Sequence, residues 1–121
     1  MKENNCAIIQ VGGILGKKWS IPIIEELFFE KKIGFNKLQK SMKIISPRIL
    51  SQRLAQLEKA KLISKKSTQK NNLLNSSYSL TKKGKELQQL INQLKQFGIK
   101  WDNVQAQCLE TKCSNCEKFI E

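Results

Sequence analysis

Apolar side chains recur three and four residues apart in several stretches of the chain, and this spacing predicts amphipathic helices. We expect a first short helix over Ala7–Leu15, weakened by two internal glycines, and a second from Ser20 to about Phe29. Ser20 is expected to cap the second helix, with Pro22 in its first turn, where a missing N–H costs little. A further short apolar stripe follows at Phe35, Leu38 and Met42.

The clearest start of a helix lies near the middle of the chain. Ser46 is expected to cap it, because a serine oxygen can accept the free N–H groups of a first turn, and Pro47 suits the first helical position. This helix is expected to end near Lys59 and to bury Leu50, Leu54 and Leu57. Its opposite, polar side carries Arg48, Ser51, Gln52, Ala55 and Lys59.

The second half of the chain predicts a hairpin and a long helix. Two short strands, at Leu62–Ser67 and Tyr78–Leu80, are expected around an Asn-rich loop, Thr68–Ser77, that is too long for a two-residue turn. Thr81 then caps a helix whose apolar residues alternate at spacings of three and four, as in a helix that packs along another helix. This seam consists of Leu87, Leu90, Leu94, Phe97, Trp101, Val104 and Cys108.

This order of elements is that of a winged helix-turn-helix domain, mainly α with a small β-hairpin and a long C-terminal dimerisation helix. With 121 residues the chain has room for one domain, which we place at 1–107, followed by a cysteine-containing tail at 108–121. Aromatic residues are expected in the core or at an interface. They are Phe28, Phe29 and Phe35 in the helical core, and Trp19 and Trp101 in either place.

Charge and composition narrow the function. The net charge of +12 favours a polyanionic partner, with nucleic acid first and an anionic membrane surface second, although a solubilising lysine-rich surface is the alternative. No apolar run approaches the roughly 18 residues of a membrane span, and no signal-peptide pattern begins the chain. The sequence has no histidine, which removes the commonest general base, and its four cysteines suggest a reducing compartment. We therefore expect a cytoplasmic protein that is not an enzyme and does not enter membranes.

The middle helix carries the candidate base-reading residues. Arginine can pair in a bidentate way with guanine and glutamine with adenine, so Arg48 and Gln52 near the helix start suit the major groove of double-stranded DNA. A simply solvated polar face is the alternative. Arg53 lies on the flank of this helix, where a core contact or an ion pair is as plausible as a DNA contact. The full DNA-binding set is Ser46, Pro47, Arg48, Ser51, Gln52, Lys43, Lys65, Lys66 and Lys70, with Lys37 and Lys40 as further phosphate contacts.

Several motifs, in order, resemble the HxlR family of bacterial and archaeal transcriptional regulators. They are LGKKW at 15–19, GFNKL at 34–38, ISPRILSQRL at 45–54, LE at 57–58 with KLI at 61–63, YSLT at 78–81 with Gly84, and Trp101. The resemblance implies a homodimeric winged-helix regulator whose dimer is built from the N-terminal and long C-terminal helices. It also makes Cys6 a candidate sensor of oxidants or electrophiles. Two departures are Lys18 in place of a family glycine and an Asn-rich wing without the proline that many members carry.

The remaining cysteines form a C-x4-C-x2-C pattern at Cys108, Cys113 and Cys116. Three thiolates are one short of a tetrahedral zinc site, and Cys6 can supply the fourth if the chain ends meet. The spacing also matches a plant-type iron–sulfur cluster, and free redox-active thiols, with Cys6 and Cys108 as the reactive pair, are the third possibility.

The sequence is therefore consistent with two functions. The first is a homodimeric, sequence-specific DNA-binding transcriptional regulator that responds to redox state or metal through its cysteines. The alternative is a winged-helix protein–protein interaction module with a metal-binding cysteine tail.

Overall fold

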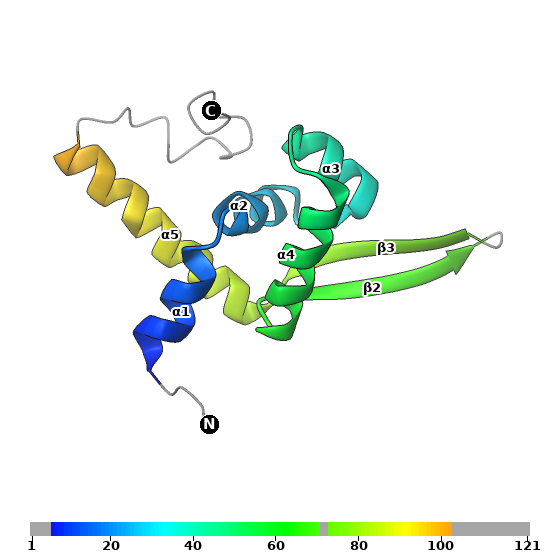
Figure 1. Ribbon diagram of the computed structural model, residues 1–121, viewed down its shortest axis with the longest axis horizontal. Helices are drawn as coiled ribbons and strands as arrows, with labels where there is room; N and C mark the ends of the chain where they lie inside the picture. The colour runs from blue at the N-terminus through cyan, green and yellow to red at the C-terminus, as the bar shows by residue number, and fades with distance from the viewer. Residues whose placement is uncertain (1–5, 71–72, 103–121) are drawn as a thin grey trace.

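The computed structural model describes residues 6–70 and 73–102, so Val104, the expected 107/108 domain boundary and the C-terminal cysteines lie outside the described residues. The fold is the expected winged helix-turn-helix, with a hairpin projecting from one side and a long helix from the other (Figure 1). The elements are α1 (Ala7–Leu15), α2 (Ser20–Glu30), β1 (Ile33–Gly34), α3 (Phe35–Met42), α4 (Pro47–Lys59), β2 (Ile63–Lys70), β3 (Leu73–Leu80) and α5 (Lys82–Trp101).

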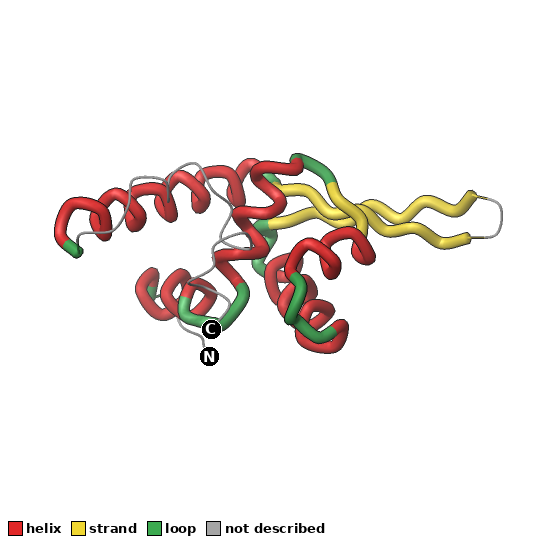
Figure 2. Tube along the Cα trace, turned by 90° about the horizontal axis from the view of Figure 1, so that it is seen from above, coloured by secondary structure: helices red, strands yellow, loops and turns green. Residues whose placement is uncertain are grey.

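Helix α2 lies at the centre of the core. Its Ile23, Ile24 and Leu27 are fully buried, because α3, α5 and the sheet all pack against this helix. From above, α5 and the sheet form one layer and α3 and α4 lie together below it (Figure 2). Among the described helices none is both long and apolar enough to cross a bilayer.

The sheet is antiparallel in the order β1-β3-β2. Strands β2 and β3 stay paired from Ile63↔Leu80 to Lys70↔Leu73, so only residues 71 and 72 separate them. The expected long Asn-rich loop is therefore wrong. Thr68 and Asn75 are instead exposed partners in the ladder, next to the half-buried Ser76 and Ser77, and backbone pairing of such polar strands needs no apolar alternation. The two-residue strand β1, which pairs Ile33 with Tyr78, gave no periodic signal and was not expected.

Two of the three expected helix caps are confirmed. The Ser46 hydroxyl accepts from the Ile49 N–H at 3.2 Å, and the Thr81 hydroxyl accepts from the Gly84 N–H at 3.1 Å. Ser20 does not cap α2, so the expected cap at this residue is wrong. The capping position is taken by Trp19 in a left-handed conformation (φ 80°), and Ser20 is the buried first residue of the helix.

The aromatic residues divide between core and surface. Trp19 is buried and Phe35 packs partly against the core, as expected. Phe28 and Phe29 are 40% and 36% exposed and meet edge to face, so their expected core position is wrong. All six residues from Pro22 to Leu27 are buried, so neighbouring elements surround α2 up to Leu27, and the two phenylalanines follow beyond this covered part.

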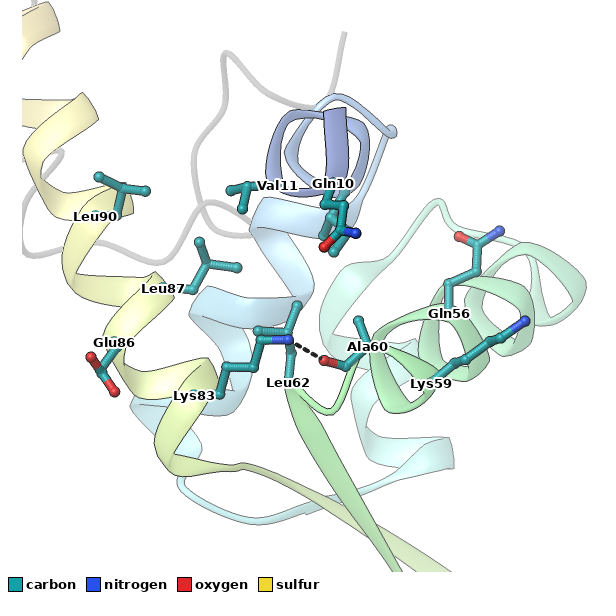
Figure 3. Close-up of a pocket in the computed structure, with 11 residues that line it drawn as sticks. Gln10, Val11, Gln56, Lys59, Ala60, Leu62, Lys83, Glu86, Leu87 and Leu90 are labelled. Carbon is teal, nitrogen blue, oxygen red and sulfur yellow. Dashed lines mark hydrogen bonds between the residues drawn. The ribbon is translucent and has the colours of Figure 1, made fainter. Parts of the chain in front are cut away.

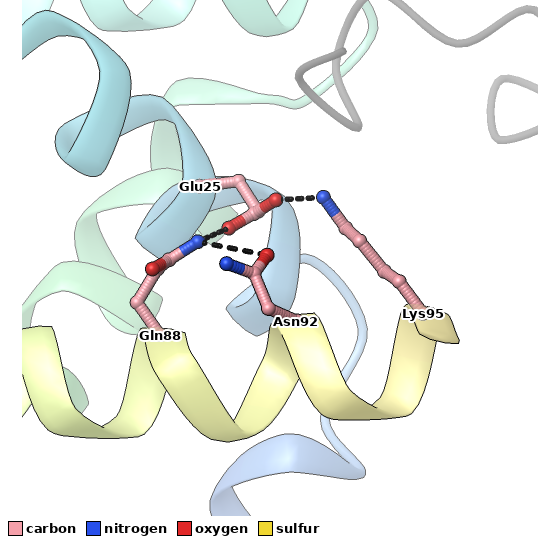
Figure 4. A network of polar contacts seen from close by, with 4 residues as sticks. All are labelled: Glu25, Gln88, Asn92 and Lys95. Carbon is pink, nitrogen blue, oxygen red and sulfur yellow. Dashed lines mark hydrogen bonds and ion pairs between the residues drawn. The ribbon is translucent and has the colours of Figure 1, made fainter. Parts of the chain in front are cut away.

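Two adjacent carboxylates of α2 are fully buried, and each is bound by a neighbouring helix. Glu25 accepts a hydrogen bond from the Gln88 amide of α5 at 2.8 Å and forms an ion pair with Lys95 of the same helix (Figure 4). Glu26 accepts from the Ser41 hydroxyl of α3 at 2.6 Å. A buried carboxylate is costly unless it is paired in this way, so these contacts fix the neighbours of α2.

Replacing Lys95 with methionine tests the buried pair. We expect Lys95→Met to lower the free energy of unfolding by about 3–5 kcal/mol, because it leaves the Glu25 charge buried without its cation. Adding Glu25→Gln removes that charge and recovers most of the loss. Urea unfolding at fixed protein concentration measures both, with the exposed Lys85→Met as the matched control, expected within about 0.5 kcal/mol of wild type. Equal stability of Lys95→Met and Lys85→Met would contradict the pair's role.

Candidate nucleic-acid interface

Helices α3 and α4 form the helix-turn-helix, joined by residues 43–46. The turn starts tightly, because the Ile44 N–H donates to the Met42 carbonyl at 2.8 Å around Lys43, whose φ is 64°. Such a three-residue turn with positive φ is strained for a residue with a side chain. It leaves Lys43 exposed directly after the end of α3.

Helix α4 is anchored along one side and open along the other. Leu50, Leu54 and Leu57 are buried, which confirms the expected apolar stripe. The candidate base-reading residues Arg48 and Gln52 are exposed, and Arg48 makes no side-chain hydrogen bond or ion pair within the described part of the chain. Exposed residues of the start and polar side of α4 are Ser46, Pro47, Arg48, Ser51, Gln52, Ala55 and Lys59.

Arg53 has partners that the sequence did not predict. Its Nε donates to the backbone carbonyl of Lys18 at 2.9 Å, and its Nη1 donates to Gln56 Oε1 at 3.3 Å. The contact is therefore neither an apolar core contact nor an ion pair with an acid. It joins α4 to the turn between α1 and α2, which no pattern along the chain could reveal.

The wing lysines extend the basic surface along the hairpin, which projects past α3 and α4 as an arm (Figure 1). Lys65 and Lys66 are both exposed, and as neighbours in a strand they lie on opposite faces of the ribbon. The backbone of Lys70 pairs with Leu73 at the last described step of the ladder. The α3 lysines Lys37 and Lys40 are exposed as well.

A polar pocket of about 520 Å³ lies between the start of α3 and the wing. Lys32 and Lys37 line this pocket together with Thr68 and Asn75 of the hairpin. Lys32 was not among the expected contacts, because it precedes the helix-turn-helix and only the local Lys31-Lys32 pair marks it in the sequence. The pocket adds a cation to the basic surface where helix and wing meet.

The N-terminal and long helices share a second open surface. A groove of about 700 Å³ runs between α1, the end of α4 and α5, with Val11 on one side and Leu87 and Leu90 on another (Figure 3). Helix α1 buries none of its residues, and Ile8 is 79% exposed. The expected seam of α5 is mostly uncovered in the single chain: Leu90, Leu94, Phe97 and Trp101 are all large exposed apolar residues.

Cys6 is the one sensor candidate whose position is described. It occupies the N-cap position of α1, makes no side-chain capping hydrogen bond there, and is exposed. The other proposed thiol ligands, Cys108, Cys113 and Cys116, lie outside the described residues. Within 6–70 and 73–102, no three potential metal-ligating side chains gather in one place.

The fold and the exposed α4 define a winged helix-turn-helix protein of the transcription-regulator class. The model of the HxlR-like helix-turn-helix family matches residues 14–106, and the chain belongs to this family. The resemblance seen in the motifs is thereby confirmed.

Known proteins agree with this assignment. The chain is 31% identical over 86 residues to YdzF, an uncharacterised HTH-type transcriptional regulator of Bacillus subtilis (strain 168), covering 71% of this chain and 78% of YdzF. The reduced form of the transcriptional regulator YodB from B. subtilis has a similar fold, with a TM-score of 0.70 at 23% identity over 81% of this chain and 95% of that one. The reduced form of the redox regulator HypR also has a similar fold, with a TM-score of 0.70 at 22% identity over 78% of this chain and 92% of that one.

Proposed function

We propose that this transcriptional regulator binds specific DNA sequences as a homodimer. The observation that carries the proposal is the exposed start of α4, where Arg48 and Gln52 have no competing core role while three leucines hold the opposite side of the helix. Arginine and glutamine at this place can read guanine and adenine in the major groove. The exposed lysines of α3 and the wing suit phosphates on either side.

Substitution of Arg48 tests base reading. We expect Arg48→Ala to weaken binding to a duplex selected from random sequences by about 1–3 kcal/mol and to change binding to random DNA little. The control Lys66→Ala removes an exposed wing cation, so it should weaken both and lower the salt slope by about one. Fluorescence anisotropy titrations between about 50 and 200 mM salt measure all of these.

Two outcomes of those titrations count against the proposal. Equal loss on selected and random DNA in Arg48→Ala removes the base-reading role from Arg48. Failure of the wild-type chain to bind any duplex at the lower salt favours the alternative, a winged-helix module that docks a protein partner and uses its charge for solubility.

We propose that a second copy of the chain packs on the exposed apolar seam of α5. Most of the seam lies about 120° around the helix from Gln88, Ile91 and Lys95, so packing of α5 on its own core leaves four seam residues exposed, Leu90, Leu94, Phe97 and Trp101. Val11 of α1 lies across the groove from Leu87 and Leu90, and α1 also exposes Ile8 and Ile9. A dimer formed here can present two α4 helices to half-sites about 34–36 Å apart.

Charging the seam should separate the dimer. We expect Leu94→Glu to raise the dimer dissociation constant by about 10²–10⁴-fold, since each copy loses about 1.5–3 kcal/mol of apolar burial. The matched control is Gln96→Glu, which adds the same charge at an exposed position on the opposite side of α5. Sedimentation velocity over a concentration series measures the change. A dimer that tolerates Leu94→Glu as well as Gln96→Glu contradicts the proposed interface.

We further propose that Cys6 makes DNA binding responsive to thiol oxidation. Support comes from its exposure at the start of α1 beside the proposed dimer surface, and from the fold shared with a redox regulator. A disulfide formed there constrains the end of α1 and can shift the equilibrium between two arrangements of the dimer.

Oxidation of the Cys6→Ser variant tests the sensor. We expect diamide, which takes two thiols to a disulfide and is itself reduced to the hydrazine, to weaken DNA binding of wild type about 5–150-fold. Cys6→Ser should keep its affinity, and dithiothreitol should restore the wild type. Cys108→Ser serves as the parallel variant that identifies the second thiol. An oxidation effect that persists in Cys6→Ser assigns sensing elsewhere.

A further inference from the structure

We propose that Arg53 is a positioning residue that locks the recognition helix α4 to the turn between α1 and α2, so that movement of α1 reaches α4. The consequence for DNA reading rests on the proposed function, but the mechanical link between the two elements does not. The link is assembled from two features of the chain: a left-handed turn and one guanidinium.

The carbonyl that Arg53 reaches lies just before α2. At the start of α2 the Ile23 N–H donates to the Trp19 carbonyl at 3.0 Å, which is the usual step of four residues. Lys18 precedes the capping residue Trp19, so its carbonyl lies outside the series of helical hydrogen bonds. The Arg53 Nε donates to this carbonyl at 2.9 Å.

Both ends of this contact are held in place. On α4, the Arg53 Nη1 also donates to Gln56, one turn further along the helix, so the half-buried guanidinium has a defined direction. On the turn, the backbone of Trp19 is left-handed and its ring is buried in the core. The Lys18 carbonyl between these two anchors therefore has little freedom to move without carrying α4.

Helix α1 needs such a link because it lies apart from the end of α4. Gln10 and Val11 of α1 line the 700 Å³ groove together with Gln56 and Lys59 of α4, as Figure 3 shows for the labelled side chains. None of the residues of α1 is fully buried, and Ile14 and Leu15, next to the turn, pack partly against the core, so a displacement of α1 also moves the turn. A displacement of α1 is then passed to α4 through the Lys18 carbonyl and Arg53.

Hydrogen exchange in the absence of DNA tests the link directly. Gly12→Pro breaks α1, while Gly12→Ala is the matched control, because a Cβ at this position meets nothing within 4 Å. We expect Gly12→Pro to lower the protection of α4 amides at 48–54 about tenfold in the otherwise wild-type chain. In the Arg53→Lys background, where α4 is already less protected, Gly12→Pro should add less than about twofold. Protection of α2 serves as the internal reference for global destabilisation.

Equal effects of Gly12→Pro in both backgrounds overturn the proposal, and so does unchanged α4 exchange in Arg53→Lys.

DNA binding separates positioning from direct contact. We expect Arg53→Gln to keep the wild-type salt slope while losing preference for the selected duplex, because the side chain acts on α4 and touches no phosphate. A slope lowered by about one shows a phosphate contact and overturns the positioning role. If the wild type binds no DNA at all, the proposed function fails, and the exchange experiment still decides the link.

Discussion

Two carboxylates buried side by side on α2 set the arrangement of the helices around it. Water does not reach Glu25 or Glu26, so each needs a donor from a neighbouring element, and each finds it on a different helix. Ser41 brings α3 to one carboxylate, and Gln88 and Lys95 bring α5 to the other. Two helices that meet only through apolar side chains can slide past each other at little cost. A buried carboxylate bound by two donors of the neighbouring helix keeps its hydrogen bonds only when the two helices stay aligned. The contacts of Gln88 and Lys95 consequently define the rotation of α5 about its own axis.

That rotation determines which side of α5 stays open. Because Gln88 and Lys95 must face α2, the leucines and aromatics of the seam point elsewhere and remain exposed. The same division operates in α4, where buried leucines on one side leave Arg48 on the other. In both helices the buried residues set the rotation of the helix, and this rotation determines which side chains stay exposed and can bind a partner. The interface proposals for DNA and for a second chain follow from this one geometrical rule.

Sequence reasoning succeeds where the determinant is local and fails where it is not. The caps at Ser46 and Thr81 and the α4 leucines depend on neighbours within a few positions, so spacing alone reveals them. The wing's length comes from backbone pairing of polar strands, which has no hydrophobic period. The exposure of Phe28 depends on where the covering helices end, and the partner of Arg53 lies 35 positions away. The candidate base-reading residues could be chosen from the sequence by residue type and position, and the structure adds only that their side chains are exposed.

The weakness of α1 gives the Arg53 contact its significance. A nine-residue helix with two central glycines is marginal alone in water, and this one buries no residue in its own chain. In the proposed dimer its exposed isoleucines gain a partner, so its stability and position depend on association and on the state of Cys6. The proposed contact between Arg53 and the Lys18 carbonyl would make the orientation of the recognition helix depend on the position of this marginal helix.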